Sequence, residues 1–140
     1  MARRATVQAD LFAPSPEAQR AKAEALREGA GQVLQAWVRY QEARGAQVSP
    51  TERRLEVIAK AMEAGEYTAT RLVVYLRWVF TAPARWPGWM RKPGHPYLEV
   101  DNLFRRSHLQ EHLQEAEEWA RAQGEEGGVV ALYGDRSYTG

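Results

Sequence analysis

Apolar residues recur at helical spacing between residues 16 and 44, and this stretch predicts the first helix. Ser15 provides an N-cap oxygen, and Pro16 suits the first helical position, where a missing N–H costs nothing. The apolar residues of its second half share one face: Val33, Leu34, Trp37 and Val38. Gly29 and Gly31 leave open whether the stretch forms one helix or two.

Two further helices are predicted in the middle of the chain. Residues 49–52 (SPTE) have the pattern of a capping box, in which Ser49 is the N-cap and Glu52 reaches back to it. The helix that follows ends at Gly65, and its apolar stripe is Leu55, Ile58 and Met62. Residues 68–81 are apolar on nearly every side, which predicts a buried central helix. Their β-branched residues are compatible with a strand, but the length of the stretch favours a helix.

The segment 83–96 is predicted to lack regular structure, because four prolines and two glycines interrupt it. Its Trp-Pro-Gly-Trp centre has the composition of a turn. A short helical turn at residues 101–105 is expected next, with Leu103 and Phe104 facing inward.

The last helix is predicted to begin at Ser107, which can form a capping box with Gln110, and to end near Gln123. Residues 124–128 are expected to be a linker. Residues 129–133 are compatible with a short strand or with an arm that becomes ordered on a partner.

The pattern as a whole predicts an all-α fold, a compact bundle of four to five helices with flexible N- and C-terminal arms. Residues 15–123 form the helical domain in this prediction. Residues 1–14 are a flexible tail, and residues 124–140 are the linker and C-terminal arm.

Composition narrows the possible function classes. The chain has no cysteine, which excludes disulfides and thiolate-bound metals. No stretch approaches the roughly 18 consecutive apolar residues of a membrane span. Arg3 and Arg4 are not followed by an apolar run, so a secretory signal is not expected. We therefore expect a soluble protein of the cytoplasm, without membrane contact.

The net charge of +1 hides an uneven distribution along the chain. Residues 71–106 hold seven Arg or Lys against two acidic residues, whereas residues 107–128 hold six acidic residues against one Arg. This asymmetry predicts one basic face and one acidic face. The alternative is that both runs are ordinary solvated faces of helices.

Residues 8–12, Gln-Ala-Asp-Leu-Phe, resemble the pentapeptide by which polymerases and repair factors bind the bacterial sliding clamp. Leu11 and Phe12 would enter a preformed apolar pocket, Gln8 would form hydrogen bonds beside it, and Asp10 has the acidic character that the motif accepts. A few such anchors can supply most of the binding energy of an interface. The alternative is that Leu11 and Phe12 fold back onto their own domain.

The segment after the central helix combines cations with flat rings, which is the combination that single-stranded nucleic acid requires. Its candidate binding residues are Arg85, Trp86, Trp89, Arg91, Lys92 and His95, with Arg105 and Arg106 as an extension. The alternative is that both tryptophans fill the core beneath a long loop while the arginines face solvent.

One pattern suggests a metal site. Residues 108–112 (HLQEH) match the inverted zinc-peptidase pattern, and the spacing places His108 and His112 on one helical face. The 28 residues that follow offer no distant third ligand, so a solvated polar face is the preferred interpretation. Neither a phosphate-binding glycine loop nor a nucleophile elbow occurs, and we expect no enzyme activity, no metal and no cofactor.

Three segments carry a wider resemblance: residues 33–37 (VLQAW), 49–54 (SPTERR) and 97–105 (YLEVDNLFR). Together with the apolar helix that leads to the Trp-containing loop, they resemble the C-terminal domain of phage DnaD-like replication proteins of the helicase-loader type. The resemblance covers roughly Val33 to Ala120. It implies a helical module that contacts single-stranded DNA and the replicative helicase. The family's winged-helix domain is not found in this sequence, so autonomous origin recognition is not expected.

The sequence thus favours a non-enzymatic, phage-type replication accessory protein. Its expected partners are the sliding clamp, the replicative helicase and single-stranded DNA. The alternative is a phage regulator that binds host RNA polymerase and alters transcription, with the acidic last helix and the Val-containing arm as its contact surfaces.

Overall fold

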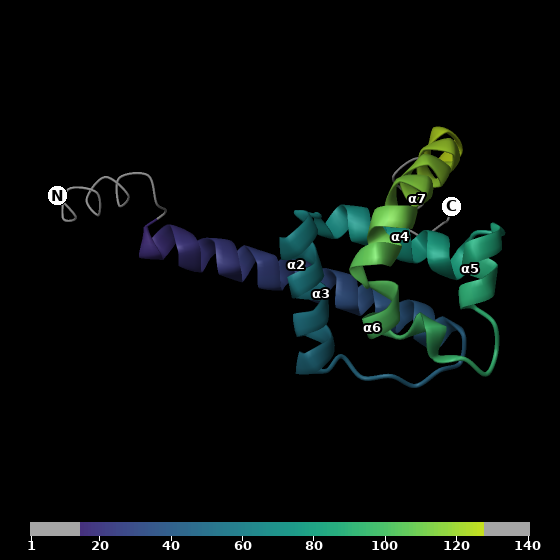
Figure 1. The fold of residues 1–140 in the computed structure, drawn as a ribbon, viewed down its shortest axis with the longest axis horizontal. Coiled ribbons are helices and arrows are strands. Elements are labelled where there is room, and N and C mark those ends of the chain that lie inside the picture. Colours follow the sequence, from purple (N-terminus) through teal and green to yellow (C-terminus); the bar gives the residue numbers. More distant parts are fainter. Residues whose placement is uncertain (1–14, 128–140) are drawn as a thin grey trace.

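The fold is entirely helical over the part of the chain that the structure, a computed structural model, describes, which is residues 15–127 (Figure 1). This confirms the predicted all-α class. The elements in chain order are α2 (Pro16–Ala43), α3 (Glu52–Gly65), α4 (Ala69–Thr81), α5 (Arg85–Met90), the 3-10 helix η1 (Pro96–Leu98), α6 (Val100–Leu103) and α7 (Arg106–Gly127). None of these helices is long and apolar enough to cross a membrane.

Helix α2 is a single helix that continues through both of its glycines. The Ser15 hydroxyl accepts a hydrogen bond from the Ala18 N–H at 3.0 Å and caps its first turn, as predicted. A Cβ on Gly29 would lie 3.0 Å from Met62 Cε, so glycine at this position allows α3 to approach closely. The second half of α2 lies against the body of the protein, and the first half projects away from it (Figure 1).

The N-cap of α3 is Thr51, which corrects the predicted cap at Ser49. The Thr51 hydroxyl accepts from the Arg54 N–H at 3.2 Å. Glu52 does not close a capping box because its carboxylate instead accepts from the Arg27 guanidinium at 2.9 Å. Ser49 contributes its carbonyl, which accepts from Arg54 Nη1 at 2.7 Å.

The prediction that residues 83–96 lack regular structure is wrong, because Arg85–Met90 form α5 and Pro96–Leu98 form η1. The prolines do not prevent these turns. Pro87 is the third residue of α5, where its missing N–H would have had no partner within the helix. The first hydrogen bond of α5 runs from the Gly88 N–H to the Ala84 carbonyl at 3.1 Å.

Leu103 and Phe104 are buried, as expected for the short helical turn now seen as α6. Helix α7 begins at Arg106 rather than at Ser107, because the Leu109 N–H already bonds the Arg105 carbonyl at 3.1 Å. It continues to Gly127, so residues 124–127 are helical and not a linker. Residues 1–14 and 128–140, where the two arms were predicted, lie outside the described range.

The core is built around α4, which packs against α2, α5 and α7. Its largest fully buried side chains are Trp78 and Tyr75, and Trp37 of α2 is also fully buried. Two of these rings use their polar atoms inside the core. Trp37 Nε1 donates to the Leu98 carbonyl at 2.8 Å, and the Tyr75 hydroxyl donates to the Leu103 carbonyl at 2.5 Å. The first bond holds η1 against α2, and the second holds α6 against α4.

Replacing Tyr75 by Phe should lower the free energy of unfolding by about 1–3 kcal/mol, because a buried carbonyl loses its partner while the ring is kept. Burial raises the pKa of Tyr75, so its hydroxyl remains a donor throughout the neutral range. Urea denaturation with an unchanged m-value would measure the loss. Tyr67→Phe is the matched control, since the Tyr67 hydroxyl has no hydrogen bond to another described residue. Equal effects of both variants would contradict this role.

Candidate nucleic-acid interface

Helix α5 places its two tryptophans in opposite environments. Trp86 is half-buried and stacks on His112 with ring centroids 3.9 Å apart and on Trp78 at 5.8 Å. Trp89, one turn later, is 53% exposed. Trp86 therefore fills the edge of the core, which was the alternative interpretation of this segment, whereas Trp89 is available to a partner.

Trp89 belongs to an aromatic row that we call the ledge, in which the half-buried Tyr97 lies between the exposed rings of Trp89 and His95. The rings of Trp89 and Tyr97 are 6.3 Å apart with 17° between their planes, and those of His95 and Tyr97 are 4.9 Å apart and inclined by 4°. Gly94 has a φ of 84°, a left-handed conformation that suits glycine, in the turn that leads from α5 back to η1. The ledge is thus assembled from two short elements that sequence patterns did not predict.

Two cations accompany the ledge. Lys92 Nζ lies 4.9 Å from the centroid of the Trp89 ring. Arg85 is exposed and lines an open groove of about 390 Å³ together with Trp86, Trp89 and Glu115. The groove therefore offers two indole rings, a cation for a phosphate and a carboxylate that accepts hydrogen bonds.

The other predicted cations do not join this groove. Arg91 is half-buried, and its Nη1 donates to the Val79 carbonyl at 2.8 Å, near the C-terminal end of α4. Arg106 lines a separate hollow beside the end of α3, with Tyr67 among its neighbours. Arg105 is exposed immediately before α7. The predicted basic patch therefore narrows to Arg85 and Lys92.

The two histidines of the HLQEH segment pack against Trp86. The edge of Trp86 meets His108 at 5.2 Å between centroids, while His112 stacks on its face. His108 Nδ1 is 2.7 Å from the Asn102 carbonyl, which requires a proton on Nδ1. Among the side chains described, those of residues 15–123, no cluster of three or more His, Asp or Glu is arranged to hold a metal ion.

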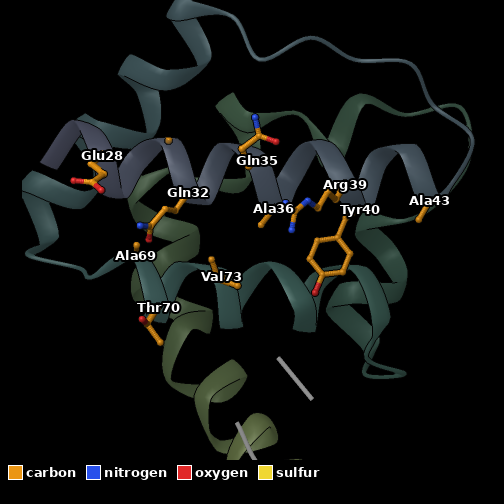
Figure 2. Close-up of a pocket in the computed structure, with 11 residues that line it drawn as sticks. Glu28, Gln32, Gln35, Ala36, Arg39, Tyr40, Ala43, Ala69, Thr70 and Val73 are labelled. Atoms are coloured by element: carbon orange, nitrogen blue, oxygen red, sulfur yellow. The ribbon is translucent and has the colours of Figure 1, made fainter. Parts of the chain in front are cut away.

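Sequence reasoning missed a second and larger concavity, a groove of about 880 Å³ between α2 and α4 (Figure 2). Its lining residues are Glu28, Gly31, Gln32, Gln35, Ala36, Arg39, Tyr40, Ala43, Ala69, Thr70 and Val73. One feature of the α2 sequence is consistent with this groove. Small and polar residues alternate at helical spacing on the side of α2 away from its apolar stripe.

The clamp-like pentapeptide, with Gln8, Asp10, Leu11 and Phe12, lies outside the described residues. No family model, curated protein or solved structure matches this chain.

The two tryptophans of α5 should respond differently to truncation. Trp86→Ala should lower the free energy of unfolding by about 2–4 kcal/mol, because it removes a ring packed on three others. Trp89→Ala should lower the free energy of unfolding by only about 0.5 kcal/mol, since about half of the side chain is already exposed to solvent. Urea denaturation of both variants checks this. A larger loss for Trp89→Ala would mean that the ledge is a structural element.

Proposed function

We propose that this protein is a non-catalytic replication accessory module of the phage type that binds single-stranded DNA on the ledge. The observation that carries the proposal is the stack of Trp89, Tyr97 and His95, in which Trp89 and His95 are exposed, with Lys92 and Arg85 beside it. Single-stranded nucleic acid binds such surfaces because every base has a stacking face and every phosphate attracts a cation. In residues 15–127 Trp89 is the one large apolar side chain that is exposed.

The interaction energies favour a nucleic-acid base over the Lys92 ammonium group as the contact on the face of the Trp89 ring. A cation over an exposed aromatic ring contributes about 0.5–1 kcal/mol. Stacking of one base on an aromatic side chain contributes roughly 1–3 kcal/mol. A base that stacks on the face of Trp89 covered by Lys92 therefore gains more than the displaced ammonium loses. The freed ammonium group then becomes available to the adjacent phosphate.

In this proposal the pentapeptide of residues 8–12 recruits the module to the sliding clamp, and the helical body contacts DNA and the replicative helicase. Tethering to the clamp raises the local concentration of the ledge near the template. Two individually weak contacts then act together. The resemblance of residues 33–37, 49–54 and 97–105 to the DnaD-like domain supports the same setting.

Trp89→Ala should weaken binding of a fluorescent single-stranded oligonucleotide about 5- to 100-fold, the equivalent of one lost stacking contact. Trp89→Phe, which keeps a smaller ring, should retain most of the affinity. Fluorescence anisotropy at low salt measures both. Absence of detectable binding by the unmodified protein at low salt would refute the DNA-binding proposal.

The salt dependence of the same assay separates the contributions of charge and stacking. Arg85→Ala should reduce the slope of log affinity against log salt by about 0.7, because one phosphate contact is lost. Trp89→Ala should leave the slope unchanged. Lys60→Ala removes an exposed cation from α3 and is the matched control. Equal slopes for Arg85→Ala and Lys60→Ala would exclude Arg85 from the interface.

Replacing both Leu11 and Phe12 by Ala should abolish capture of the sliding clamp from nuclease-treated host lysate while oligonucleotide binding persists. The expected loss follows because two apolar anchors leave a preformed pocket. Clamp captured equally well by the double variant would refute the tether. Recovery of RNA polymerase subunits instead of clamp or helicase would support the alternative role in transcription.

A further inference from the structure

The two halves of α2 differ in how far they are packed. Residues 28–43 lie against the body and form one wall of the groove in Figure 2. Residues 16–27 are exposed apart from Leu26, which is partly buried against the core. An ion pair of 2.8 Å from Arg27 to Glu52 joins this projecting half to α3. Residues 16–27 of this 28-residue helix are therefore surrounded largely by solvent.

The groove is an open concavity between two helices, and we consider whether a third helix fits it. It runs along α2, and Ala69, Thr70 and Val73 of α4 form its other wall (Figure 2). Small residues on the α2 wall, Gly31, Ala36 and Ala43, permit the close interaxial distance of about 8–10 Å at which helices pack. The projecting half of α2 is itself rich in alanine and is similar in length to the groove.

The exposed charged residues of α2 indicate which helix could occupy the groove, because their charges are complementary to those of a second α2. Arg20 and Glu24 lie on the projecting half, and Arg39 and Glu42 lie on the groove half. None of the four side chains has an ion-pair partner among residues 15–123, whose side chains the structure describes. Their signs alternate along the chain. When two copies of α2 run antiparallel and meet between Gly31 and Gln32, Glu24 faces Arg39, and Glu42 lies one residue from the position opposite Arg20.

We propose that two copies of this chain form a symmetric dimer in which each projecting half of α2 occupies the α2–α4 groove of the other. A two-fold axis makes every contact occur twice, so two Glu24–Arg39 pairs and two Arg20–Glu42 pairs form. The paired segment, residues 20–43, is about 36 Å long. This inference does not depend on the proposed DNA binding, because the groove and the ledge use different residues.

Gly31 supports the position of the axis. A glycine inside a helix costs about 1 kcal/mol relative to alanine. Within a single chain nothing requires it, since a Cβ on Gly31 would meet no atom within 4 Å. At the crossing point of two helices, however, a missing side chain allows the backbones to approach each other. The dimer thus gives Gly31 a role that the isolated chain does not.

Sedimentation equilibrium at concentrations up to about 100 µM tests the proposal. The unmodified protein should show twice the 15.9 kDa mass of the chain. Arg39→Glu and Glu24→Arg should each weaken dimerisation at least tenfold, because each places like charges together twice. The double variant R39E/E24R should recover the dimer, since the pairs re-form with reversed signs. Lys60→Glu, an exposed charge reversal on α3, should have no effect.

A monomeric mass for the unmodified protein at every concentration would overturn the dimer. A double variant that associates no better than its parent single variants would overturn the antiparallel register. Gly31→Glu provides a test that is free of misfolding. It should raise helicity and thermal stability in the monomer, as the higher helix propensity of Glu predicts. It should also weaken dimerisation at least tenfold, and an undiminished dimer would overturn the proposed crossing point.

Discussion

A helix that is apolar over most of its circumference needs cover on most of its sides, and α4 imposes this constraint on the rest of the structure. Leu72, Tyr75, Leu76, Trp78 and Val79 of α4 are all buried. The surrounding helices α2, α5 and α7 supply that cover. The position of the ledge is a consequence. Helix α5 covers one side of α4 with Trp86, and Trp89 lies at the exposed margin of that cover.

Local patterns predicted the parts of the fold that local physics determines. The apolar stripes and the Ser15 cap located α2, α3, α4 and α7 to within a few residues. The errors arose where distant residues decide between local options. Arg27 draws Glu52 away from a capping box, so the cap moves to Thr51. Helix α5 forms in a proline-rich segment because its Trp86 packs on the His112 ring of α7, which is remote in sequence.

The composition of the candidate site was likewise more predictable than its geometry. Sequence reasoning identified the α5 region as aromatic and basic, but it could not separate Arg85, which faces solvent, from Arg91, which binds the Val79 carbonyl. Tyr97 was missed because its contribution depends on the turn at Gly94 that returns the chain towards Trp89. The α2–α4 groove escaped notice for a related reason. The sequence of α2 shows a face of small and polar residues, but a concavity between two helices also depends on how they pack.

The continuity of α2 through Gly29 and Gly31 also has a mechanical consequence. A straight helix is a stiff spacer, and residues 16–27 hold Ser15 about 18 Å from the point where α2 meets the body. A large partner attached to the residues before Ser15 would therefore be kept clear of the helical body and of the ledge. In an antiparallel pair, the two attachment points would lie at opposite ends of a rod about 46 Å long. The length of α2 would then fix the distance between two tethered partners.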